Sequence, residues 1–283
     1  AIFEDDNRPG IQIVGSANNI GIIQFGDNAG ANQGQVNYVH SSDTLQLGAA
    51  AAIQLALDAN SRISLSNNDT GSNNTIFGHT AGDPDGAGDQ NVFIGELAGG
   101  AGIQTDAADN NVGIGWSALT ALTTGDGNIA IGSYAGDAIT TGQKNTAVGF
   151  GALSTEDTGY YNTAVGFEAL MTYNYNGEGN NTAVGCLAAR GLETGTSNIA
   201  IGAEAMKVHT TGNNNIAIGK NAMVDTNAGA YTLASSDNVF IGFDSGSGVW
   251  VNTDSDSGNN ENIAIGSKTM DAAMDGCEGN VAI

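Results

Sequence analysis

Asn128-Ile-Ala-Ile-Gly132, Asn145-Thr-Ala-Val-Gly149 and Asn162-Thr-Ala-Val-Gly166 are copies of one five-residue motif, spaced 17 residues apart. The motif occurs eleven times between Asn74 and Gly266, and a twelfth copy begins at Asn280. Successive motif asparagines are separated by 17, 20, 17, 17, 17, 19, 17, 17, 23, 24 and 18 residues, so the basic unit is 17 with insertions. A short fixed period is typical of a solenoid, in which each unit buries its apolar side against its neighbours.

The residues inside the motif indicate which kind of solenoid this is. β-branched residues such as Ile129 and Ile131 stand at alternating positions, which favours an extended strand. Helical solenoids use units of about 33 to 47 residues, whereas 17 residues fit two short strands and tight turns. A recurrent pair seven residues after the motif asparagine, such as Ala118-Leu119, is expected to mark the second strand or a corner. The sequence therefore predicts an all-β fold with a parallel β-solenoid, or β-roll, over residues 72–283.

A stripe of alanines runs through the centre of the motif. Because side chains alternate across a strand, Asn, Ala and Gly share one face and the two β-branched residues share the other. Small side chains let another backbone approach closely, so we expect this stripe to pack on copies of the same chain in a homo-oligomer. The alternative is a monomer whose small, flat face is exposed to solvent. The expected interface residues are Ala130, Ala147, Ala164, Ala183, Ala200 and Ala217.

The repeat Asn-Thr-Ala-Val-Gly, followed by Ala-Leu and Thr-Thr-Gly, resembles the repeats of phage tail-fibre proteins. It is also similar to the head repeats of trimeric autotransporter adhesins, which use a shorter unit. The first resemblance implies a homotrimeric structural segment of a virion's tail fibre that serves host attachment, with a host cell-surface glycan or protein as partner. The second implies a trimeric adhesin at a bacterial surface.

Residues 1–71 predict a small β domain of hairpins. Short strands are expected at Ile11–Val14, Gly21–Phe25, Gln35–Val39 and, further on, at 44–47, 53–57 and 62–65, separated by Gly-, Asn-, Ser- and Asp-containing turns. The order of these segments resembles a region of phage tail fibres that precedes the repeats. The sequence ends inside the twelfth motif, so we expect the solenoid to continue beyond Ile283.

The charge of the chain limits its partners. The chain carries 7 Lys plus Arg against 30 Asp plus Glu, a net charge of −23, which repels nucleic acid and anionic membrane surfaces. No apolar run is long enough to cross a bilayer, so membrane insertion is not expected. The acidic start, Ala1-Ile-Phe-Glu-Asp-Asp, does not resemble a secretory signal.

One acidic loop is a candidate metal site. Asp83, Asp85 and Asp89 stand at close spacing on a glycine-rich segment, and calcium prefers oxygen ligands. The segment lacks the bidentate glutamate of an EF-hand. A solvated loop that keeps the protein soluble is the competing interpretation. Apart from calcium, no cofactor is expected.

Aromatic residues in the insertions are candidate ligand contacts. Tyr173, Tyr175, Tyr231 and Trp250 lie in segments that interrupt the 17-residue period, and loops on a rigid scaffold commonly carry binding residues. The alternative is that these rings pack their loops onto the coil. Trp116, inside a regular unit, is expected to pack rather than bind.

Catalysis is not expected. Glycoside hydrolysis needs two carboxyls flanking a cleft, and Glu168 and Glu204 are two coils apart in the repeat. A polysaccharide-cleaving tailspike and an ice-binding solenoid remain less favoured alternatives. Cys186 and Cys277 are five coils apart, roughly 24 Å at the strand spacing, so a disulfide within one chain is excluded by a stacked solenoid.

Overall fold

The structure is a computed structural model that describes residues 20–27, 30–39, 44–49, 52–57, 63–64, 73–82, 88–100, 108–225, 235–251, 259–272 and 274–283. The chain divides into two compact units, Ala1–Asp69 and Thr70–Ile283. Every regular element within the described residues is a strand, which confirms the predicted all-β fold class.

The first unit contains one antiparallel sheet whose strands pair in chain order. Ile23 lies opposite Val36, which in turn lies opposite Leu47, so consecutive strands form hairpins as predicted. The strand expected at Ile11–Val14 lies outside the described residues. The strands are β1 (Ile20–Asp27), β2 (Gly30–Val39), β3 (Thr44–Ala49), β4 (Ala52–Leu57) and β5 (Ile63–Ser64).

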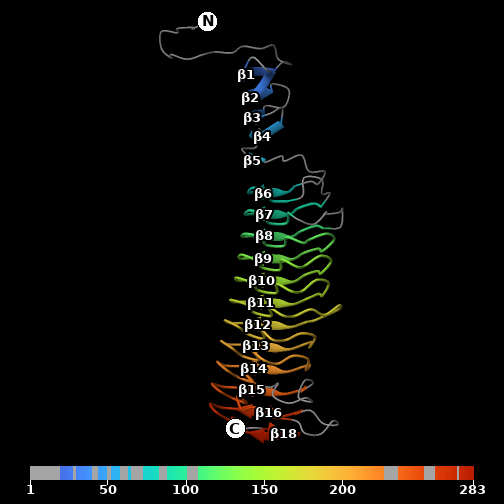
Figure 1. The fold of residues 1–283 in the computed structure, drawn as a ribbon, viewed down its shortest axis with the longest axis vertical. Coiled ribbons are helices and arrows are strands. Elements are labelled where there is room, and N and C mark those ends of the chain that lie inside the picture. The colour runs from blue at the N-terminus through green and yellow to red at the C-terminus, as the bar shows by residue number, and fades with distance from the viewer. Residues whose placement is uncertain are drawn as a thin grey trace. The chain divides into compact units, whose positions relative to one another are not determined.

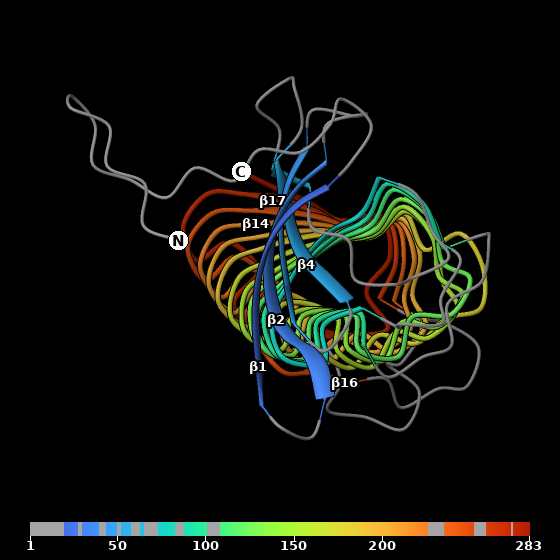
Figure 2. The same cartoon turned by 90° about the horizontal axis from the view of Figure 1, so that it is seen from above.

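The second unit is a stack of coils that share a 12-stranded parallel sheet (Figures 1 and 2). Each coil contributes one short strand to this sheet, and β16 (Trp250–Val251) pairs with β18 (Met274–Asp275) in a separate parallel sheet. The strands of the long sheet are β6 (Thr75–Phe77), β7 (Val92–Ile94), β8 (Val112–Ile114), β9 (Ile129–Ile131), β10 (Thr146–Val148), β11 (Thr163–Val165), β12 (Thr182–Val184), β13 (Ile199–Ile201), β14 (Ile216–Ile218), β15 (Val239–Ile241), β17 (Ile263–Ile265) and β19 (Val281–Ala282).

The coils stack in exact register. Ala147 pairs with Ala130 on one side and with Ala164 on the other, so equivalent residues lie directly above one another. The Ala-Leu pair forms a corner rather than a second strand, and Leu119 there has a φ of 53°. Its amide donates to Ala135 O in the next coil at 3.1 Å, so the corners are also hydrogen-bonded from coil to coil.

The alanine stripe faces the interior of each coil, which contradicts the predicted interface on that face. The alanines are at most 1% exposed in a single chain, while the β-branched residues beside them point outward, with Ile129 and Ile131 both 39% exposed. The physical reason is space: the coil closes on itself, and its narrow interior accommodates only a small strand residue opposite a corner side chain. The buried residues are Ala130, Ala147, Ala164, Ala183, Ala200 and Ala217.

The motif asparagines form a buried ladder along the solenoid. The backbone N–H of Asn145 donates to Asn128 Oδ1 at 3.0 Å, and Asn145 Nδ2 donates to Gly159 O of the following coil at 2.8 Å. Asn145 Oδ1 then accepts the N–H of Asn162. The repeated asparagine thus satisfies buried backbone groups that the short strands leave unpaired.

The motif glycine is required by close approach between coils. Gly149 has a φ of 134°, and a Cβ placed on it would lie 2.3 Å from Gly166 O. No L-residue fits there without displacing the neighbouring backbone.

Side-chain size is balanced across the interior. In five of the seven complete coils whose strand carries alanine, the corner residue is Leu or Met, as with Ala147 and Leu153. Where the strand carries Phe93 or Phe240 instead, the corner residue is Gly99 or Gly246. A Cβ on Gly99 would lie 2.6 Å from the Phe93 ring, and one on Gly246 would lie 2.3 Å from the Phe240 ring.

Candidate functional site

The outward side of the long sheet presents a row of partly exposed residues along the solenoid. We call this surface the strand face; it consists of the two outward residues of each strand from β6 to β15 and of β17. Its residues are all Thr, Val, Ile or Phe, and none is charged. They are Thr75, Phe77, Val92, Ile94, Val112, Ile114, Ile129, Ile131, Thr146, Val148, Thr163, Val165, Thr182, Val184, Ile199, Ile201, Ile216, Ile218, Val239, Ile241, Ile263 and Ile265.

An aromatic row borders the strand face just past the motif glycine. Its members are Trp116, Tyr134, Phe150 and Phe167, from four successive coils. Their ring centroids are 4.6, 5.9 and 5.5 Å apart in that order. Phe150 and Phe167 are nearly half exposed, and so is Trp116, which packs edge-on against Tyr134. The row extends the apolar surface sideways, and the regular repeat alone did not point to it.

Two of the aromatic residues predicted to contact a ligand are instead part of the core. Tyr173 and Trp250 are fully buried, and Trp250 Nε1 donates to Gly246 O at 3.0 Å while its ring packs on Phe240. The alternative interpretation, rings that fix an insertion to the coil, holds for both. Tyr175 is 37% exposed and remains available for contact, whereas Tyr231 lies outside the described residues.

Of the three predicted calcium ligands, only Asp89 lies among the residues that the structure describes. Asp83 and Asp85 lie outside the described residues. Asp89 is half-buried, and its backbone N–H donates to the Asp109 carboxylate at 2.7 Å. Among the residues described, no group of three or more His, Cys, Asp or Glu side chains is placed to hold a metal ion.

Three ionisable side chains occupy one column of the core. The column lies eleven residues after each motif asparagine, where other coils carry Leu122, Ile139 or Leu192. Its ionisable members are Glu156, Tyr173 and His209. Burial raises the pKa of Glu156, although the N–H of Gly159 donates to its carboxylate at 2.5 Å. Burial, and next the Glu156 charge, raise the pKa of Tyr173.

The imidazole of His209 is held in its uncharged form by burial. Burial lowers its pKa from 6.5 to about 4, so the ring is neutral in the folded protein at pH 7. Its Nε2 lies 3.2 Å from Asn215 Nδ2 of the asparagine ladder. A neutral ring can accept a hydrogen bond at that nitrogen, whereas a protonated ring cannot.

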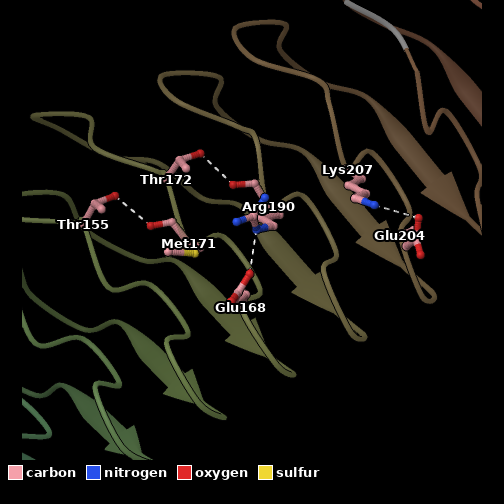
Figure 3. A network of polar contacts seen from close by, with 7 residues as sticks. All are labelled: Thr155, Glu168, Met171, Thr172, Arg190, Glu204 and Lys207. Carbon is pink, nitrogen blue, oxygen red and sulfur yellow. Dashed lines mark hydrogen bonds and ion pairs between the residues drawn. The ribbon is translucent and has the colours of Figure 1, made fainter.

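The carboxylates considered for glycoside hydrolysis each pair with a cation on the outside of the coils (Figure 3). Glu168 Oε2 lies 2.6 Å from Arg190 Nε, and Glu204 Oε2 lies 3.0 Å from Lys207 Nζ. In the same region Thr172 Oγ1 donates to Arg190 O at 2.6 Å, which ties neighbouring coils together.

Cys186 carries a free thiol, and Cys277 is partly exposed. Cys186 is exposed and follows its motif glycine directly, as Phe150 and Phe167 do in their coils. The described residues contain no helix that could span a membrane.

No family model matches the sequence, and no curated protein or solved structure matches it.

Proposed function

We propose that this chain is a structural segment of a phage tail fibre that takes part in host attachment as a homotrimer. The observation that carries the proposal is the continuous ladder of strands and buried asparagines from Asn74 to Asn280, which links every coil to the next. Eleven steps at the strand spacing give a rod roughly 53 Å long. Such a rod holds a recognition element away from a particle without bending.

The sequence resemblance to tail-fibre repeats supports this choice over other stiff proteins. Host attachment through several identical chains gains avidity, since each further contact forms at high effective concentration. The expected partner is a glycan or protein of the host surface, and the expected location is the virion. Exposed Tyr175, on the insertion after Tyr173, is the retained candidate for contact.

A trimeric adhesin of a bacterial surface is the second candidate. The same solenoid fits both roles, because a spacer is needed in either case. The genetic neighbourhood distinguishes them: tail or baseplate genes beside the reading frame support the fibre, and an outer-membrane anchor in the same reading frame contradicts it.

Binding to cells tests the attachment role itself. The purified chain, fluorescently labelled, is mixed with a panel of bacteria and with immobilised bacterial surface polysaccharides. Saturable binding to one strain or glycan, reduced at least tenfold by Tyr175→Ala, supports a contact at this insertion. Unchanged binding by that variant would remove Tyr175 from the proposal. Release of shortened polysaccharide would contradict the purely structural role and favour a tailspike.

A further inference from the structure

The strand face lacks charge on a chain whose net charge is −23. Two copies of so acidic a chain repel each other over most of their surfaces. On the strand face this repulsion is weakest, because every residue there is Thr, Val, Ile or Phe. Electrostatic repulsion therefore favours this face over the others for contact between two copies of the chain.

The exposure of the strand face is also unusual for a surface left in water. Ile131 and Ile201 are 39% and 38% exposed, and Ile265 near the last coil is 41% exposed, so the apolar surface does not fade along the rod. The strand geometry gives a strip roughly 10 Å wide and 50 Å long, about 500 Å² before side-chain relief is counted. The aromatic row enlarges this apolar area. The combined area of strip and row approaches the roughly 800 Å² that each partner buries in a standard interface. Contiguous apolar patches of this size mark interaction sites.

The shape of the strip restricts what can cover it. A matching partner must be straight and apolar along the whole length of the solenoid, with relief that repeats at the coil spacing. Another copy of the same chain meets these conditions.

We propose that copies of this chain dock on one another through the strand face and the bordering aromatic row, parallel and in register. The parallel arrangement rests on the proposed fibre role, in which all chains run outward from one particle. In this arrangement coils of equal number lie at equal height. The β-branched residues then form the contact between chains, while the alanines stay inside each chain.

Two paired variants test the docking surface. Ile131→Glu/Ile201→Glu places two charges on the strand face, and Val208→Glu/Val249→Glu places two charges on exposed valines that do not belong to it. Both pairs change the net charge equally. Solution mass by light scattering is measured for the unaltered chain and both variants, with circular dichroism to show that the strands remain.

We expect multimers for the unaltered chain and the valine pair, and a folded monomer for the isoleucine pair. A monomeric unaltered chain, or a multimer that survives the isoleucine pair, would overturn the interface. A monomer that still binds cells would leave the attachment role in place while removing the docking surface. A monomer that binds glycan through its strand face would replace self-association by carbohydrate recognition.

Cys186 tests the arrangement of the chains. Copies in parallel register bring their Cys186 thiols to the same height beside the strand face, so mild oxidation by a copper–phenanthroline complex should yield covalent dimers on a non-reducing gel. Cys186→Ser should remove these dimers and Cys277→Ser should leave them. Multimers that never cross-link through Cys186 would overturn the parallel register.

Discussion

The motif asparagines from Asn91 to Asn262 are stable inside the coils because both ends of each amide have partners in neighbouring coils. Asn145 donates to Gly159 O at 2.8 Å, and its Oδ1 accepts from the N–H of Asn162 at 3.0 Å. Buried polar groups without partners cost about 1–3 kcal/mol each, so the ladder is a condition for closing the coil.

Asn145→Leu should therefore destabilise the solenoid although the side chain keeps a similar size. Gly159 O and the Asn162 N–H lose a partner, and we expect a loss of about 3 kcal/mol. The midpoint of urea unfolding measures this, and Asn176→Leu, at an exposed asparagine, is the control. Equal effects of the two substitutions would mean that the ladder does not stabilise the fold.

Gly149→Ala should be among the most damaging single changes. A Cβ would lie 2.3 Å from Gly166 O, at a φ of 134° that side chains rarely adopt. At Gly127 the φ is 68° and the nearest atom, Lys144 Cγ, is 3.5 Å away, so Gly127→Ala should cost only about 1 kcal/mol. Thermal unfolding compares the two, and a milder effect at Gly149 would contradict the close packing of coils.

His209 should make stability depend on pH. Its folded pKa of about 4 lies below the ordinary 6.5, so the unfolded chain binds a proton first as pH falls. The contribution of the neutral His209 ring to the free energy of unfolding is therefore fully present above pH 6.5. It is lost as the pH falls toward 4, by up to about 3 kcal/mol.

The matched variant for this effect is His209→Leu, since Leu192 fills the same position in the preceding coil. Burial raises the pKa of Asp137 to about 6 and also that of Glu156, so these carboxyls oppose the histidine in the same range. The difference between the pH profiles of the two proteins isolates His209. If stability depends on pH identically in the two proteins, the His209 ring is not held buried and neutral in the folded state.

At the scale of the coil, the strand and the corner share one interior volume. Phe93 occurs with Gly99, whereas Ala147 occurs with Leu153 and Ala164 with Leu170. Gly99 has a φ of 61°, close to the 53° of Leu153, so the backbone at this corner also accommodates leucine. A large strand residue with a small corner residue should therefore be replaceable by a small strand residue with a large corner residue, provided that both change together.

Phe93→Ala alone should cost about 3–5 kcal/mol through a cavity, and Gly99→Leu alone should clash with the Phe93 ring. The double variant Phe93→Ala/Gly99→Leu recreates the common coil and should recover most of that loss. A double-mutant cycle from urea unfolding measures the coupling. Additive effects would mean that the two positions do not share the interior.

The sequence predicted the elements better than their orientation. The 17-residue period and the β-branched alternation correctly placed the strands of the long sheet. Alternation shows which residues share a face but not which face points inward, and alanine is compatible with either. The alanine face points inward because the coil closes on itself and because the asparagines on that face bond to residues a full coil apart.

The same limit explains the aromatic residues. Tyr173 and Trp250 lie in insertions, where exposure is common, yet each fills the interior of its coil. Conversely, Trp116 lies in a regular unit but is nearly half exposed, because the residue after the motif glycine points outward. The burial of Glu156 and His209 was not predicted either. Both are polar residues at a position that other coils fill with leucine, so the sequence carries no apolar signal there.

In the whole solenoid, the β-branched side of each strand is the side that meets another chain in the proposed assembly. Thiol reactivity at two adjacent residues tests this in a background of Cys186→Ser and Cys277→Ser. Ala147→Cys probes the interior and Val148→Cys probes the strand face. Each is measured in the assembled protein and in the monomer produced by Ile131→Glu/Ile201→Glu.

Ala147→Cys should stay unreactive in both states until the protein unfolds, whereas Val148→Cys should be protected in the assembly and reactive in the monomer. Equal reactivity of Val148→Cys in both states, or reactivity of Ala147→Cys that appears on dissociation, would contradict the account.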